Sequence, residues 1–244
     1  MISIFRKIRK NAFENSENIS GKKEHTARYL KYALGEIILV VIGILIALQI
    51  NNWQNQVKEN QLEKRYISNL INDLKNDSTA LHANYLALKL QASSKDSLFE
   101  IFKGEKSESD SLLFYFKRQW LPITPYNPVK SAFDEMISNS HLGLIKPDSL
   151  RESILKLYAS YDAFSKLEHF QSVYFTNTMD ELQHRVPNLL DPIAEDVLAI
   201  TEDFYIMNKV NQNGANYRRD SYEKMLSTCK AVLSNLNEYK AKIN

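Results

Sequence analysis

The chain has 244 residues, enough for one or two domains, and it is 44% hydrophobic and 25% charged, as expected for a chain that folds. Glycine and proline number six each, which argues against an all-β fold with many tight turns and favours long helices. After position 50 there are 23 basic and 25 acidic residues, so the usual basic surface of a nucleic-acid-binding protein is excluded. The single cysteine, Cys229, excludes an internal disulfide.

The N-terminal residues 1–28 carry a basic amphipathic pattern, with apolar side chains at helical spacing and basic ones between them. The pattern predicts a short cytoplasmic helix lying on the anionic inner leaflet of a membrane. The alternative is a basic tail that only sets the topology. The residues expected to contact the membrane surface are Ile2, Phe5, Arg6, Lys7, Ile8, Arg9 and Lys10.

Residues 29–53 are predicted to form a transmembrane helix. The 19 residues from Tyr32 to Ile50 hold one charge, and as a helix they reach about 28 Å, roughly one hydrocarbon core. Tyr29 and Tyr32 lie at one end and Trp53 at the other, as aromatic rings do at membrane interfaces. No small-residue cleavage site follows, so a cleaved signal peptide fits poorly. A buried core helix would not explain the basic flank.

The distribution of basic residues predicts the orientation of this helix. Eight lysines and arginines precede Tyr32, where the apolar stretch begins, and residues 51–65 hold only three. The positive-inside rule then places the N-terminus in the cytoplasm and residues 51–244 outside it. In a Gram-negative bacterium, this means a span in the inner membrane and a periplasmic C-terminal domain.

One face of the span carries its only charge and its small residues. At 100° per residue, Glu36, Gly43 and Ala47 fall within about 20° of one line, with Ile50 near it. Gly43 and Ala47 form a small-xxx-small pair, which allows two helices to approach closely. These four residues are the candidate transmembrane interface. Glu36 either bonds to a neighbouring helix or reaches the headgroups or takes a proton.

Two sequence blocks resemble a known family. FRKIRK, followed by YLKYALGEIILVVIGILIALQINNW, is similar to the start of a family of single-pass bacterial membrane proteins of unknown function. The later blocks RQWLPITPYNPVKSAFDEMI and SHLGLIKPDSLRESILKLYASYDAF resemble the same family. The resemblance implies membrane insertion and carries no activity, ligand or catalytic residue to this chain.

The region beyond the span is predicted to be all-α, with a stalk helix over 54–92 and a helical bundle over 93–244. Apolar residues recur at spacings of three, four and seven along the stalk, but Asp77 interrupts them, so packing against later helices is favoured over a coiled coil. Ser149 and Glu152 form a candidate capping box at the start of a long helix. The predicted bundle helices are 95–103, 108–119, 129–139, one opening at Pro147–Asp148 and ended by Pro187, 192–210 and 216–242.

An aromatic cluster beside the proline-rich segment is a candidate partner-binding patch, and its alternative is a hydrophobic plug beneath a loop. Its residues are Phe114, Phe116, Trp120 and Tyr126, with Tyr115 beside them.

No catalytic pattern stands out. A di-iron bundle needs two Glu-x-x-His units, and only Glu181 to His184 fits. Glycine-rich phosphate loops and nucleophile elbows are lacking in the sequence. We therefore expect no enzyme activity, cofactor or metal.

The expected function is that of a membrane scaffold or accessory subunit, which contacts lipid and forms a homo-oligomer or joins a larger membrane complex. The alternative is an extracytoplasmic sensor or adaptor that signals through the stalk helix to a separate effector.

Overall fold

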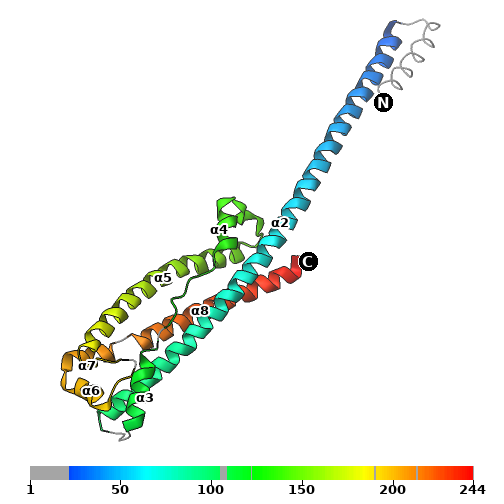
Figure 1. The fold of residues 1–244 in the computed structure, drawn as a ribbon. Coiled ribbons are helices and arrows are strands. Elements are labelled where there is room, and N and C mark those ends of the chain that lie inside the picture. Colours follow the sequence, from blue (N-terminus) through cyan, green and yellow to red (C-terminus); the bar gives the residue numbers. More distant parts are fainter. Residues whose placement is uncertain (1–21, 105–108, 122, 190, 213, 244) are drawn as a thin grey trace. The chain divides into compact units, whose positions relative to one another are not determined.

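A computed structural model describes residues 22–104, 109–121, 123–189, 191–212 and 214–243 (Figure 1). Every regular element within these ranges is a helix, which confirms the all-α prediction. The chain divides into two compact units at Lys58 and Glu59. We describe each unit separately. The predicted membrane-surface helix at residues 2–10 lies outside the described residues.

The longest element is helix α2, Lys22–Phe102. The sequence places no proline within it, so nothing interrupts its backbone hydrogen bonds. It ends before Gly104, whose φ of +82° suits glycine and whose N–H donates to the carbonyl of Ile101 at 2.9 Å. The long N-terminal helix is thereby confirmed, and the predicted separate helix at 95–103 is wrong. Ser93 and Ser94 donate their hydroxyls back to the Leu90 carbonyl, within α2, instead of capping a new helix.

The other elements are all shorter than α2, and only α5 and α8 among them exceed 11 residues. The predicted helix at 192–210 is broken into three pieces, because the Asp203 side chain accepts hydrogen bonds from the backbone N–H groups of Tyr205 and Ile206 and so starts a new helix. The elements after α2 are α3 (Ser109–Gln119), α4 (Ser131–Ser138), the 3-10 helix η1 (His141–Leu144), α5 (Asp148–Gln183), α6 (Ala194–Ala199), the 3-10 helix η2 (Ile200–Glu202), α7 (Phe204–Asn211) and α8 (Ala215–Ile243).

The start of α5 differs from the predicted capping box. Pro147 is the N-cap residue, with extended backbone, so Ser149 already lies inside the helix and caps nothing. The Pro147 carbonyl accepts the N–H groups of Leu150 and Arg151, both at 3.1 Å. Proline's fixed φ and the acidic Asp148 in the first turn therefore start this helix.

The main core of the second unit lies between α2, α5 and α8. Figure 1 shows α5 and α8 running beside the later part of α2, and α5 packs directly against α8. Apolar residues of all three helices point into this core, which accounts for most of the hydrophobic stabilisation of the unit. Its fully buried members include Ile67, Leu70, Leu74, Leu81, Leu88, Ile154, Leu157, Tyr161, Tyr222, Cys229 and Leu236.

A second core lies where α2 ends. It joins the last turns of α2 to α3, α6, α7 and the end of α5. The short helices are held by this core, since each is too short to be stable alone. Its fully buried members are Leu98, Phe116, Leu182, Val186, Val197 and Ile200.

Candidate functional site

The first unit carries an unburied apolar surface. Among the residues that the structure describes, one helix is long and apolar enough to cross a membrane, and none of its most apolar stretch is buried. Large side chains from Ile37 to Ile50 are all about half exposed. A core helix of a soluble protein would bury such a surface, because its exposure to water is unfavourable.

The four predicted interface residues lie on this helix. Glu36, Gly43, Ala47 and Ile50 are all exposed, and helical geometry places them along one face. A Cβ atom added to Gly43 would meet no other atom within 4 Å. The site therefore has room for a second helix, and its occupation stays a prediction.

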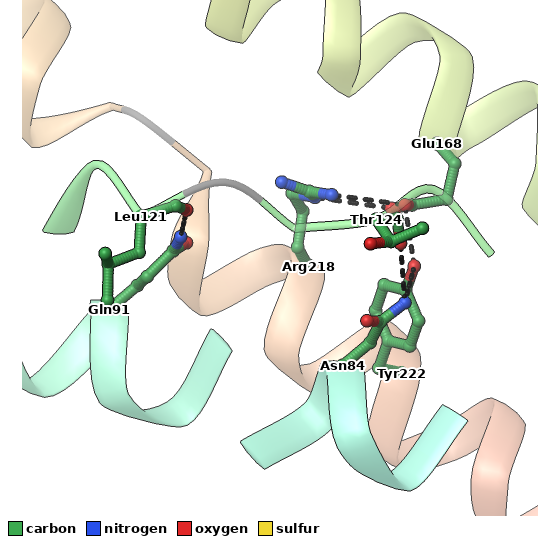
Figure 2. Close-up of polar contacts among 7 residues, drawn as sticks. All are labelled: Asn84, Gln91, Leu121, Thr124, Glu168, Arg218 and Tyr222. Carbon is green, nitrogen blue, oxygen red and sulfur yellow. Dashed lines mark hydrogen bonds and ion pairs between the residues drawn. The ribbon is translucent and has the colours of Figure 1, made fainter. Parts of the chain in front are cut away.

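In the second unit, side chains of α2 form hydrogen bonds with the backbone of an extended segment. We call this segment, residues 121 and 123–130, the strap. Asn84 donates its side-chain amide to the Thr124 carbonyl at 2.9 Å, and Gln91 donates to the Leu121 carbonyl (Figure 2). The Asp77 carboxylate accepts the Val129 N–H at 2.9 Å. The strap thus runs antiparallel to α2.

These polar side chains form one row on α2. Positions 73, 77, 84 and 91 fall within about 40° of each other on a helix, beside the buried apolar stripe. Asp73 continues the row past the strap, since it accepts the Ala132 N–H at 3.0 Å at the start of α4. The backbone N–H and C=O groups of an extended segment need hydrogen-bond partners. The row of polar side chains on α2 supplies several of these partners.

A buried ion pair joins the strap, α2, α5 and α8 (Figure 2). Glu168 on α5 and Arg218 on α8 lie 3.1 Å apart, with only 5% and 11% of their side chains exposed. The Tyr222 hydroxyl donates to Glu168 at 2.7 Å, and Asn84 donates to the Tyr222 hydroxyl at 3.2 Å. Glu168 accepts hydrogen bonds from both Arg218 and Tyr222, and Arg218 donates twice to Glu168, so the network tolerates burial and links the register of α5 and α8.

A second buried polar cluster surrounds Asp77. Its free carboxylate oxygen and the hydroxyls of Tyr126, Tyr158 and Tyr161 are buried and have no hydrogen-bond partner of good geometry among the described residues. Burial raises the pKa of Asp77, an effect partly offset by the Val129 N–H and by the nearby Tyr126 and Tyr161 hydroxyls.

Cys229 lies against the same cluster. It is fully buried, and its thiol approaches the Leu74 carbonyl at 3.5 Å. Burial raises the pKa of this thiol, which keeps it protonated and unreactive. Neither Asp77 nor Cys229 is open to a substrate.

The predicted aromatic patch does not form one surface. Phe116 and Trp120 are buried in the second core, and Tyr126 is buried in the main core between Tyr161 and Phe164. Only Phe114 is substantially exposed, at 53%. The hydrophobic plug is therefore the arrangement found, because the strap carries Tyr126 inward.

A polar hollow of about 210 Å³ lies between α2 and α4. Its acidic groups are already engaged: Glu135 pairs with Arg65 at 2.7 Å, and Asp73 accepts hydrogen bonds from Ser131 and Ala132. No group of three or more histidine, cysteine, aspartate or glutamate side chains suited to a metal ion occurs in the part of the chain that the structure describes. The hollow holds no organised catalytic arrangement.

The sequence prediction missed the polar row and the buried ion pair. For the row, a signal exists: polar residues at spacings of four, seven and seven on α2 accompany the apolar stripe. Glu168 and Arg218 give no such signal, because their 50-residue separation does not reveal that α5 and α8 face each other.

Comparison with known proteins gives one match. The family model described as "Family of unknown function (DUF6090)" matches residues 36–186. The matched region begins within the apolar stretch of α2 and includes the strap and all of α5. No curated protein and no solved structure matches.

Proposed function

The chain belongs to the DUF6090 family, whose function is unknown, and we propose that it is a non-enzymatic single-pass membrane scaffold or accessory subunit. Its N-terminus lies in the cytoplasm and its helical bundle lies outside, in the periplasm of a Gram-negative cell. It joins a homo-oligomer or a larger membrane complex through the Glu36, Gly43 and Ala47 face and through the bundle.

The observation that carries this proposal is the exposed apolar stretch of α2. Twelve consecutive residues, Ile37 to Leu48, are uncharged and apolar, and all of them are exposed. Transfer of such side chains from water to lipid is favourable by roughly 1.5 to 3 kcal/mol for each large one. The bundle, in contrast, buries its own apolar stripes and its titratable clusters, which suits a structural role better than catalysis.

Cysteine crosslinking tests the transmembrane interface. In a Cys229→Ala background, we would place single cysteines at Gly43 and Ala47 on one face, and at Leu45 as the matched control on another. We expect rapid disulfide formation, or crosslinking to a partner, at Gly43 and Ala47 and little at Leu45. Equal crosslinking at all three positions would refute the interface.

Purification in a mild detergent, followed by mass measurement, tests the scaffold role itself. We expect an oligomer or a complex with defined partners. A lone monomer under all mild conditions would contradict it.

One observation favours the sensor or adaptor as a second candidate. The helix that holds the apolar stretch, α2, also supplies Ile67, Leu74 and Leu88 to the main core. A ligand that altered the packing of the bundle would therefore act on the same helix that crosses the membrane. A signalling effector that copurifies with the chain and loses its response upon Asp77 or Glu168 substitution would favour this candidate.

A further inference from the structure

Residues 191–205 form a segment with an unusual surface, which we call the acidic tip. It contains five acidic residues and no lysine, arginine or histidine. It spans α6 and η2 and reaches the first two residues of α7, at the end of the bundle where α2 terminates (Figure 1). The buried side chains of Val197 and Ile200 hold it to the second core. Its backbone is therefore fixed by packing, and the outward side chains can be considered as a surface.

The outward side chains include large apolar ones. Phe204 is 86% exposed, the highest value of any large hydrophobic residue described, and Tyr205 is 60% exposed. Ile193 and Leu198 are exposed at 56% and 47%. Four such exposed apolar residues lie within 13 positions of the chain, on or beside short helices that pack against one another. Lys209 lies over the Tyr205 ring, 4.7 Å from its centroid. Such a concentration of exposed apolar side chains is typical of an interaction site.

The acidic groups of the tip are partly unpaired. Asp191 pairs with Lys117 and Asp203 pairs with Arg185, both at 2.9 Å. Glu195, Asp196 and Glu202 form no ion pair with any residue in the described ranges. The tip therefore combines exposed apolar side chains with excess negative charge.

We infer that the acidic tip is a docking surface for a basic amphipathic helix of a protein partner. A partner with an apolar stripe would cover Phe204 and its neighbours, and lysines or arginines beside that stripe would meet the unpaired carboxylates. The negative charge of the tip disfavours binding to an anionic lipid surface and binding to the same tip of a second copy. The inference rests on the proposed scaffold function, for which it names the surface used outside the membrane.

Model peptides test the inference directly. The full-length protein in detergent micelles would be titrated with three fluorescent 18-residue peptides: an amphipathic leucine–lysine helix, the same pattern with glutamate in place of lysine, and a leucine–lysine peptide of scrambled order. We expect the amphipathic basic peptide to bind at least tenfold more tightly than either other peptide. Its affinity should fall with added salt, because charge contributes to binding.

Substitutions in the acidic tip test whether the basic peptide binds at this surface. Glu195→Lys/Glu202→Lys should weaken it about tenfold and reduce its salt dependence, whereas Phe204→Ser/Tyr205→Ser should weaken it similarly and leave the salt dependence unchanged. The matched control is Phe170→Ser/Glu238→Lys, which changes an exposed aromatic and an exposed acid on α5 and α8. Circular dichroism would confirm that each variant is folded.

Three results would overturn the inference: equal binding of the scrambled peptide, equal loss in the control variant, or self-association of the protein that the tip variants abolish. The outcome is separable from that of the scaffold proposal. If tip variants still assemble with their partners in mild detergent and bind the peptide normally, only the docking surface is refuted. If the protein is always a monomer, the scaffold is refuted, and the peptide titration still decides the chemistry of the tip.

Discussion

Asp77 is the residue whose ionisation should be visible in the stability of the bundle. Its pKa is raised by burial in the folded state, and an unfolded aspartate has a pKa of about 3.9. The folded state therefore holds the proton more tightly, and stability should fall as pH rises above about 4, until the folded pKa is passed. Asp77→Asn keeps the oxygen that accepts the Val129 N–H and removes the charge.

We expect Asp77→Asn to be more stable than the wild type by about 1 to 2 kcal/mol at pH 8, and the difference to vanish near pH 4. Urea unfolding of the full chain in detergent, followed by Trp120 fluorescence and circular dichroism, measures this. Asp77→Ala is the control: it loses the Val129 bond and should be destabilised at both pH values. A stability difference independent of pH would contradict the assignment.

Removing one charge of the buried Glu168–Arg218 pair should lower the free energy of unfolding more than removing any other charge in the bundle. Glu168→Gln leaves the Arg218 guanidinium buried without its counter-charge, and we expect a loss of about 3 kcal/mol or more in the free energy of unfolding. Adding Arg218→Met to this variant should restore much of the loss, since the unpaired charge is removed.

The neighbouring Arg219 supplies a matched control for this prediction. It pairs with Asp220, which is 62% exposed, at 2.7 Å, and such pairs contribute at most about 1 kcal/mol. Arg219→Met should therefore be nearly neutral in the same denaturation measurement. Similar losses from Glu168→Gln and Arg219→Met would show that the buried pair has no special role.

At the scale of elements, the strap should depend on the polar row of α2. Asn84→Ala/Gln91→Ala removes two side-chain donors to strap carbonyls, and we expect a loss of about 2 kcal/mol. Amide hydrogen exchange and proteolysis within 121–130 should increase more than in the rest of the bundle. Thr79→Ala, on an exposed position of the same helix, should change neither. Unchanged protection of the strap in the double variant would contradict the proposed role of the row.

The elements that the sequence predicted correctly are those with long apolar stripes. Leu74, Leu81 and Leu88 lie seven residues apart and are all fully buried, so helical period alone located the core face of α2. Gly104 and Pro147 marked a helix end and a helix start as local chemistry requires.

The errors arose where tertiary contacts, or in one case a local helix cap, decided the outcome. The inward position of Tyr126 depends on hydrogen bonds between the strap and α2, which have no local signature. The helix predicted at 192–210 is broken because the Asp203 side chain caps the start of α7. The spacing of apolar residues there predicts one continuous helix. The pairing of Glu168 with Arg218 requires knowing which helices are neighbours. Sequence reasoning therefore reached the fold class and the long apolar helix but not the polar site.

At the scale of the whole molecule, the account requires the chain to cross the membrane once. In the proposed topology, residues 29–53 form the span, and the positive-inside rule predicts its orientation from the basic residues before it. The bundle that begins at Glu59 would then lie outside the cytoplasm, where the acidic tip would meet its partner.

Labelling with a membrane-impermeant thiol reagent tests this topology most directly. In a Cys229→Ala background, single cysteines would be placed at Ser172, which is exposed on α5, and at Ala12 on the other side of the span. In cells with any outer barrier opened, we expect Ser172→Cys to react at once and Ala12→Cys to react only after lysis. The reverse pattern, or recovery of the full-length chain in the soluble fraction without detergent, would contradict the account.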